Sequence, residues 1–180
     1  MTFKRLYLIL RLGLESDGYK KASYLKKIKY FAKQGENCYW QPVKIPPEPE
    51  LIKMGNNVVV ASDVSFITHD VIHYVLKHVA PNEFFRLQLG PIQIGNNVFI
   101  GSKSIILPNV KIGSNVIIGG GSIVSCDIPD GRIVAGVPAK EIGSFENLLN
   151  KRKLDVVEMR NKIQRYEEEW LVFYKNRSGE

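Results

Sequence analysis

The chain has 180 residues and a formal net charge of +7, and 44% of its residues are hydrophobic. This size suits one domain with a substantial core, and two cysteines are too few for a disulfide framework, so we expect reduced thiols in a cytoplasmic protein. No stretch approaches the roughly 20 apolar residues that a membrane-spanning helix needs.

Most of the excess positive charge lies in the first 34 residues. They hold nine lysines and arginines against Glu15 and Asp17, so this arm carries +7 by itself. Such an arm predicts either a solvated helix face packed on the body, which we favour, or peripheral contact with an anionic inner-membrane surface. We expect no nucleic-acid partner, because neither a binding motif nor a basic patch in the body accompanies the arm.

Two helices are predicted in the arm, over about 3–13 and 19–33. The second would place five side chains on one stripe: Tyr24, Leu25, Ile28, Phe31 and Ala32. Gly35-Glu36-Asn37 would then end it. Residues 41–50 contain four prolines, which indicates an extended segment rather than a central strand.

A six-residue repeat dominates the middle of the chain, beginning at about residue 52. An aliphatic residue returns at every sixth position and a glycine follows four of them: Ile94-Gly95, Ile100-Gly101, Ile106, Ile112-Gly113, Ile118-Gly119 and Val124. Six is not a helical period, and simple alternation does not require glycine at a fixed phase, so the repeat predicts a parallel β-helix. Three hexapeptides would form one triangular coil, with the aliphatic residue inside and the glycine at a corner where a Cβ would strain the backbone.

The repeat is interrupted once, between about residues 70 and 90. Long excursions from a regular wall usually carry function. All three histidines of the chain lie in or beside this one: His69, His73 and His78. His69 stands where the repeat stops, so it combines a rigid base with access to a cleft.

Beyond residue 143, apolar positions spaced by three to six residues predict helices over about 144–175, including Leu154 and Val157. Helices there would cover the open end of the solenoid. We therefore divide the chain into a basic helical arm (1–35), a β-helix domain (36–143) with an excursion loop (70–90), and C-terminal helices (144–180).

Four segments make the chain resemble the hexapeptide-repeat acyltransferases. They are GNNVVVASDVSFITHD (55–70), PIQIGNNVFIGSKSIILPNVKIG (91–113), IIGGGSIVSCDIPDG (117–131) and VAGVPAKEIG (134–143). Within that family the chain looks most like the sugar and capsular or lipopolysaccharide O-acetyltransferases. The resemblance implies a left-handed parallel β-helix, a homotrimer, and acetyl-coenzyme A in a cleft between adjacent subunits. It also implies polysaccharide biosynthesis, with a sugar or glycan as the acceptor and no metal.

Acetyl transfer to a hydroxyl needs a base, and an imidazole suits that task near neutral pH. The resemblance places the base at His69, with direct transfer in a ternary complex. Asp70 is a candidate for orienting the imidazole, although an aspartate at the start of a loop more often bonds its own backbone. His73 and His78 are expected on the loop surface or against a neighbouring subunit.

Further site residues are implied by the same resemblance. Glu48 matches a carboxylate that holds acceptor hydroxyls. The cofactor-binding candidates are Ser102, Gly120 and Ser125 along the pantetheine arm, and Lys140 near the phosphates of coenzyme A. The first three could equally be corners that must be small. Many relatives have a tryptophan at the position of Phe99 and a lysine at the position of Cys126. Both differences put the affinity for coenzyme A in question.

Other functions stay open at this level. An N-acetyltransferase of an amino sugar or nucleotide sugar would share the pattern. A metal-dependent hydratase on the same architecture needs three histidine ligands, and His73 and His78 have a ligand-like spacing of five. A non-catalytic trimeric scaffold is the third alternative. Serine acetyltransferases usually have a much longer helical domain before the repeats, which disfavours that activity.

Overall fold

The computed structural model describes residues 3–153 and 162–178. The chain forms two compact units, Met1–Leu148 and Leu149–Glu180. The first unit contains the whole repeat region together with the N-terminal helices.

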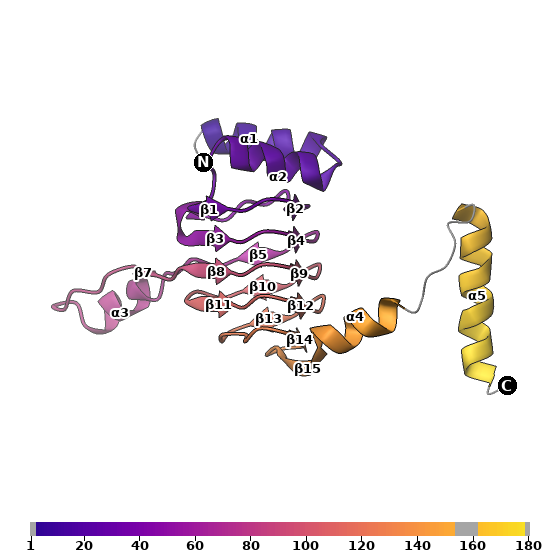
Figure 1. Ribbon diagram of the computed structural model, residues 1–180. Helices are drawn as coiled ribbons and strands as arrows, with labels where there is room; N and C mark the ends of the chain where they lie inside the picture. The colour runs from indigo at the N-terminus through magenta and orange to yellow at the C-terminus, as the bar shows by residue number, and fades with distance from the viewer. Residues whose placement is uncertain (1–2, 154–161, 179–180) are drawn as a thin grey trace. The chain divides into compact units, whose positions relative to one another are not determined.

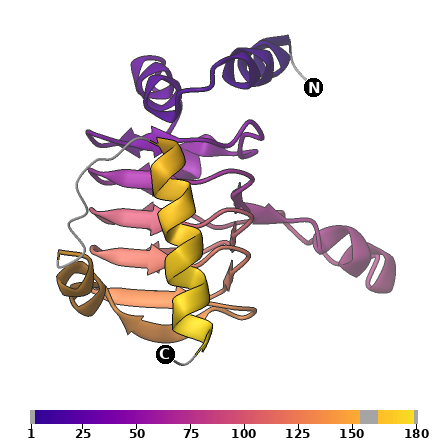
Figure 2. The ribbon, with the colours of Figure 1, turned by 90° about the vertical axis from the view of Figure 1, so that its right-hand side faces the viewer.

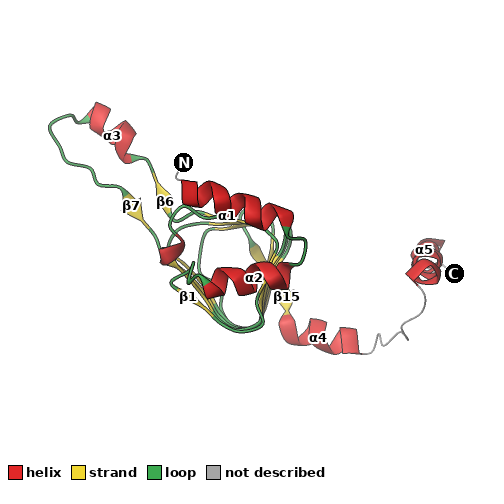
Figure 3. Ribbon diagram, turned by 90° about the horizontal axis from the view of Figure 1, so that it is seen from above, coloured by secondary structure: helices red, strands yellow, loops and turns green. Residues whose placement is uncertain are grey.

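Three ladders of short strands form the faces of a triangular prism within residues 3–153 (Figures 1 and 3). The first face consists of β1 (Lys33–Gln34), β3 (Ile52–Met54), β8 (Ile92–Ile94) and β11 (Val110–Ile112). The second consists of β2 (Tyr39–Trp40), β4 (Val58–Val60), β9 (Val98–Ile100), β12 (Val116–Ile118), β14 (Arg132–Ala135) and β15 (Lys140–Ser144). The third consists of β5 (Ser65–Phe66), β10 (Ile105–Ile106) and β13 (Ile123–Val124). Within these three ladders, neighbouring strands are parallel except in the β14–β15 pair.

The predicted aliphatic positions stack on one another inside the prism. Ile94 pairs with Ile112, and Ile100 pairs with Ile118, one coil further along the axis. All six positions of the unbroken repeat are at most 3% exposed: Ile94, Ile100, Ile106, Ile112, Ile118 and Val124. The repeat therefore builds a continuous core, because each coil buries its apolar side against the next.

The glycine that follows each aliphatic position was expected to relieve backbone strain at a corner, but the structure shows a different reason for it. Gly95 does not adopt a positive φ; a Cβ built on it would lie 2.7 Å from the carbonyl carbon of Gly113 in the next coil. The turn is made two residues later by Asn97, whose φ is 56°. Its side chain donates to Asn115 at 2.8 Å and accepts from Asn57 at 3.0 Å. The glycine thus permits close stacking of coils, while asparagine supplies the left-handed conformation.

The prism begins one coil earlier than the repeat suggests. Strand β1 pairs with β3, and β2 pairs with β4. Trp40 fills the interior of this first coil, 2% exposed and stacked on Phe66 at 5.6 Å. The aliphatic pattern is absent there, although Gly35-Glu36-Asn37-Cys38 has the corner spacing of Gly55-Asn56-Asn57-Val58.

The N-terminal arm forms α1 (Phe3–Leu14) and α2 (Gly18–Lys27), which lie across the first coil (Figures 1 and 2). The predicted second helix, 19–33, was too long. It ends because Lys29 adopts a φ of 52° and the Tyr30 N–H reaches back to the carbonyl of Leu25, a Schellman end. Residues 33–34 then join the first face as β1 instead of continuing the helix.

The excursion leaves the prism at the corner between the third and first faces, which we call the third corner. It starts as an antiparallel pair, β6 (His69–Asp70) with β7 (Gln88–Leu89). It carries α3 (His73–Val79) at its far end and projects sideways from the wall (Figure 1). The Gly90 N–H donates to the carbonyl of Thr68 at 2.8 Å and closes the neck of the loop. This hydrogen bond joins the residue before the excursion to the residue after it, so the two ends of the loop are fixed against each other.

Helices come after the last coil, as predicted: α4 (Phe145–Lys153) and α5 (Lys162–Ser178). Leu154 and Val157 lie outside the described residues. That these helices cover the open end of the coil stays a prediction; the antiparallel β15 pairs with the last parallel strand, β14. In the described part of the chain, no helix combines the length and apolar character needed to cross a bilayer.

Candidate active site

His69 and Glu48 meet at the third corner of the prism, where one coil starts and ends. Glu48 precedes the short 3₁₀ helix η1 (Pro49–Leu51), which leads into β3. His69 is the first residue of β6, just beyond β5 on the third face. The Nδ1 atom of His69 lies 2.9 Å from Oε2 of Glu48. The two side chains are brought together because the chain completes a full coil between them.

Thr68 supports the same carboxylate from inside the wall. This residue is fully buried, and its hydroxyl donates a hydrogen bond to Oε2 of Glu48. One carboxylate oxygen therefore accepts from both Thr68 and His69. Shared acceptors of this kind restrict the carboxylate to one orientation, which in turn restricts the imidazole.

The carboxyl group of Glu48 is held in its ionised form. Burial alone would raise its pKa, but hydrogen bonds from Thr68 and His69, with the charges of His69 and Arg5, outweigh burial and lower the pKa below the usual value of 4.5. An ionised carboxylate only accepts hydrogen bonds, so Nδ1 of His69 must carry the proton. In the neutral imidazole the lone pair is then on Nε2, the atom that a general base needs.

This site remains partly open to solvent. The side chains of His69 and Glu48 are 28% and 30% exposed. A fully buried histidine held by a carboxylate would act as a structural element. Here the imidazole is fixed on one side and accessible on another, which suits proton abstraction from a bound hydroxyl.

The neighbouring polar residues of the excursion, Asp70, His73 and His78, are placed differently from His69. Asp70 accepts a hydrogen bond from the backbone N–H of Ile72 at 3.0 Å, so it bonds the loop backbone and Glu48 holds the imidazole instead. His73 is half-buried and packs on Tyr74, with ring centroids 4.2 Å apart. His78 is exposed on α3. Within the described residues, no three His, Cys, Asp or Glu side chains are grouped as a metal site would require.

Two of the proposed cofactor-binding residues lie together at the second corner, between the second and third faces. Ser102 follows β9 and Gly120 follows β12, on adjacent coils. The Gly121 N–H donates to the carbonyl of Ser102 at 2.8 Å, and a Cβ added to Gly120 would lie 3.2 Å from the same oxygen. A Cβ on Gly121 would meet nothing within 4 Å. This corner therefore offers exposed backbone and open space, as an extended thiol-bearing arm would need.

The other two predicted residues lie elsewhere. Ser125 follows β13 at the third corner, the corner that also holds His69, because β5, β10 and β13 form one ladder. Lys140 is exposed at the start of β15, beside Ala139, whose N–H donates to the carbonyl of Ile123. Within one prism, the predicted site residues therefore lie at two different corners: Ser102 and Gly120 at the second, His69 and Ser125 at the third. The predicted roles of all four cofactor-binding candidates stay predictions.

Sequence reasoning missed Thr68 and the contact of Glu48 with His69. The signal for Thr68 was a polar residue at a wall position directly before the histidine. The proximity of Glu48 had no local signal, since proline-rich residues 41–50 follow no repeat.

Comparison with known proteins shows what this architecture is similar to. Residues 91–126 match the family model described as bacterial transferase hexapeptide (six repeats). Protein CapG of Staphylococcus aureus is 43% identical over 149 residues, which cover 79% of this chain and 79% of that protein.

Two solved structures are similar over most of their length. A maltose O-acetyltransferase from Clostridium difficile 630 is 25% identical, with a TM-score of 0.58 over 78% of this chain and 84% of that one. A galactoside acetyltransferase in complex with coenzyme A is 26% identical, with a TM-score of 0.54 over 82% of each chain.

Proposed function

Because this chain belongs to the family of bacterial hexapeptide-repeat transferases, and the similar solved structures are acetyltransferases, we propose that it transfers acetyl from acetyl-coenzyme A to a sugar or glycan hydroxyl. The similar enzymes act on a galactoside and on maltose, both sugars, which supports this acceptor class. The same likeness supports the left-handed winding predicted for the coils.

The observation that carries the proposal is the Thr68–Glu48–His69 arrangement. Nε2 of His69 takes the proton of the acceptor hydroxyl as its oxygen attacks the thioester carbonyl carbon. The tetrahedral intermediate then collapses, the C–S bond breaks, and the proton on Nε2 passes to the leaving sulfur of coenzyme A. Glu48 stabilises the transient imidazolium, and Thr68 keeps Glu48 in place. Atoms and charge balance without a covalent enzyme intermediate.

We place acetyl-coenzyme A along the second corner, with Ser102 and Gly120 against the pantetheine arm. Small side chains suit that place because the arm would run along exposed backbone, and the open space beside Gly121 fits it. Ser125 would contact the same arm from another subunit, and Lys140 would approach the phosphates. The galactoside acetyltransferase structure holds coenzyme A, which supports the choice of co-substrate.

The distribution of these residues supports a homotrimer with its sites between subunits. His69 and Ser125 are at the third corner of a prism, whereas Ser102 and Gly120 are at the second. A cleft that uses both corners is completed when the third corner of one copy faces the second corner of the next. We further propose a cytoplasmic location.

An acceptor screen tests the proposed activity. Release of the coenzyme A thiol is followed with wild-type protein and a panel of sugars, amino sugars, nucleotide sugars and glycans. A sugar acceptor should give turnover that disappears in His69→Ala and persists in the matched variant His78→Ala. The product should lose its acetyl group in mild alkali, as an ester does and an amide does not. An alkali-stable product would replace O-acetylation with N-acetylation, and turnover that survives in His69→Ala would overturn the mechanism.

A further inference from the structure

Helix α1 is apolar on two opposite faces. Leu8 and Leu12 are 6% and 1% exposed and belong to the core that continues into the prism. At about 100° per residue, a second stripe lies on the opposite side of the helix. Its members are exposed: Phe3 by 85%, Leu6 by 40%, Tyr7 by 57%, Leu10 by 58% and Leu14 by 87%. We call these five residues the end patch.

A helix with apolar side chains on both faces is normally covered on both. The inner face of α1 is covered by the prism, and the helix lies flat across the end of the coil (Figures 1 and 3). The end patch therefore points away from the body. The end patch is a long, convex strip along one helix. A peptide or a small ligand would instead occupy a concave groove.

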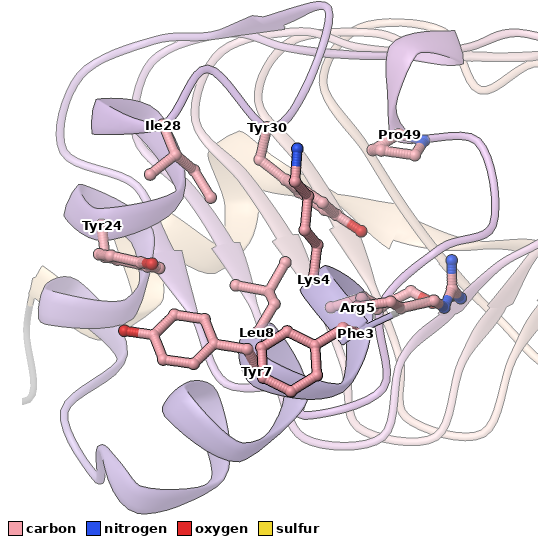
Figure 4. Close-up of a pocket in the computed structure, with 10 residues that line it drawn as sticks. Phe3, Lys4, Arg5, Tyr7, Leu8, Tyr24, Ile28, Tyr30 and Pro49 are labelled. Atoms are coloured by element: carbon pink, nitrogen blue, oxygen red, sulfur yellow. The ribbon is translucent and has the colours of Figure 1, made fainter. Parts of the chain in front are cut away.

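The patch continues into an apolar pocket between α1 and the C-terminal part of α2 with the segment that follows it. Figure 4 shows Phe3 and Tyr7 on one side of this pocket, with Tyr24 and Ile28 on the other. Lys4 and Arg5 also line it. The two terminal guanidinium nitrogens of Arg5, Nη1 and Nη2, donate to the backbone carbonyls of Pro46 and Ile45 and so fix the start of α1 on the body. The pocket offers an apolar volume under a basic rim.

The charge around the patch is mainly positive, because Glu15 pairs with Arg11 and Asp17, which caps α2, is the other carboxylate between the two helices. No acidic residue occurs in α1. Among the described residues of the two helices and the turn after them, four exposed lysines make no ion pair with a carboxylate: Lys4, Lys20, Lys27 and Lys29. The nearby pairs of Arg11 with Glu15 and of Lys26 with Glu36 leave these four available. The complement of this surface is therefore both apolar and anionic.

We propose that the end patch docks on an anionic lipid bilayer. The rod of α1 lies in the plane of the interface, its apolar stripe enters the acyl region, and the four lysines lie at the level of the phosphates. Docking of this kind does not depend on acetyl transfer. In the trimer proposed above, with the prisms side by side, three patches would face one surface and bind it together.

Vesicle flotation of the full-length protein tests this. Wild-type protein should bind vesicles of phosphatidylcholine and phosphatidylglycerol at least ~10-fold better than phosphatidylcholine alone. Leu10→Ser/Leu14→Ser, which leaves the charge unchanged, should lower that binding by about 10-fold. The matched control Val137→Ser/Ile142→Ser changes two side chains that are 68% and 66% exposed in other parts of the first unit, and should bind as wild type does.

Equal binding of wild type and Leu10→Ser/Leu14→Ser would overturn the proposal, as would no binding of wild type to anionic vesicles. A third outcome is a change of oligomeric state in Leu10→Ser/Leu14→Ser, measured by light scattering, without vesicle binding by wild type. That result would make the patch a contact between copies and would also overturn it. Acetyl transfer to a water-soluble acceptor should be normal in wild type and in Leu10→Ser/Leu14→Ser, so failure here is distinguishable from failure of the proposed activity.

Discussion

Glu48 and His69 are 21 positions apart in the chain, yet Nδ1 of His69 lies 2.9 Å from Oε2 of Glu48. The contact exists because one coil begins at Glu48 and the same coil ends at His69. Because the carboxylate accepts a hydrogen bond from Nδ1, this contact fixes the tautomer of His69 and leaves the lone pair of Nε2 available to a substrate.

Replacing His69 with alanine should lower kcat by about 10²–10⁴-fold, the usual contribution of a general base. The fold should survive, because the imidazole is partly exposed and contributes nothing to the stacked core. Thermal unfolding followed by circular dichroism checks the fold, and His78→Ala serves as the control, since its side chain lies exposed on α3.

Replacing Glu48 with glutamine should lower kcat by about 10–10²-fold, because the amide has no charge to stabilise the imidazolium. The KM for the acceptor should change little if Glu48 acts through His69. A large rise in this KM with unchanged kcat would instead support the direct contact with acceptor hydroxyls that the family resemblance implies.

Thr68→Val keeps the shape of a fully buried side chain and removes its hydroxyl. We expect a loss of about 1–3 kcal/mol in the free energy of unfolding, because Glu48 loses a donor. Activity should fall as well. Thr68→Ser, which restores the hydroxyl, should recover most of the activity; if serine and valine behave alike, Thr68 only fills space. Urea unfolding and steady-state rates measure both effects.

The pH dependence of stability should carry the signature of Glu48. Its pKa is lowered in the folded protein, so its contribution is complete above the unfolded value of 4.5 and is lost as the pH falls through the folded pKa. The difference in unfolding free energy between wild type and Glu48→Gln should therefore be largest near neutral pH and shrink in acid. A difference that is constant with pH would contradict this assignment.

Gly95→Ala should destabilise the prism by at least about 1–3 kcal/mol, because the added methyl meets backbone atoms of the next coil that cannot move aside. The matched control is Gly143→Ala, where the nearest atom to a new Cβ is the side chain of Ile133 at 3.9 Å. Denaturant unfolding compares the two. Equal stability of the two variants would mean that the coils can separate at this corner.

Much of the architecture could be predicted from residue order alone. Ile94, Ile100 and Ile106 repeat at a fixed interval because each coil must present an aliphatic side chain to its neighbour, so the periodicity records the packing directly. The interruption after His69 was visible for the same reason. The predicted β-helix domain began at residue 36, but the repeat itself was visible only from about residue 52, because Trp40 takes the place of a stacked aliphatic residue in the first coil. Helix α2 was predicted too long because the left-handed turn at Lys29 contains no glycine.

Only part of the candidate site could be predicted from the sequence. His69 was proposed as the base because it ends a periodic segment and matches the family resemblance, whereas Ser102 and Gly120 were proposed from the resemblance alone. The tertiary structure decided that Glu48 and not Asp70 holds the imidazole, that Thr68 supports Glu48, and that Ser125 and Ser102 lie at different corners. Periodicity reports contacts between equivalent positions on successive coils. Contacts of the irregular segment 41–50 with the wall arise only when the coil closes, and no local pattern encodes them.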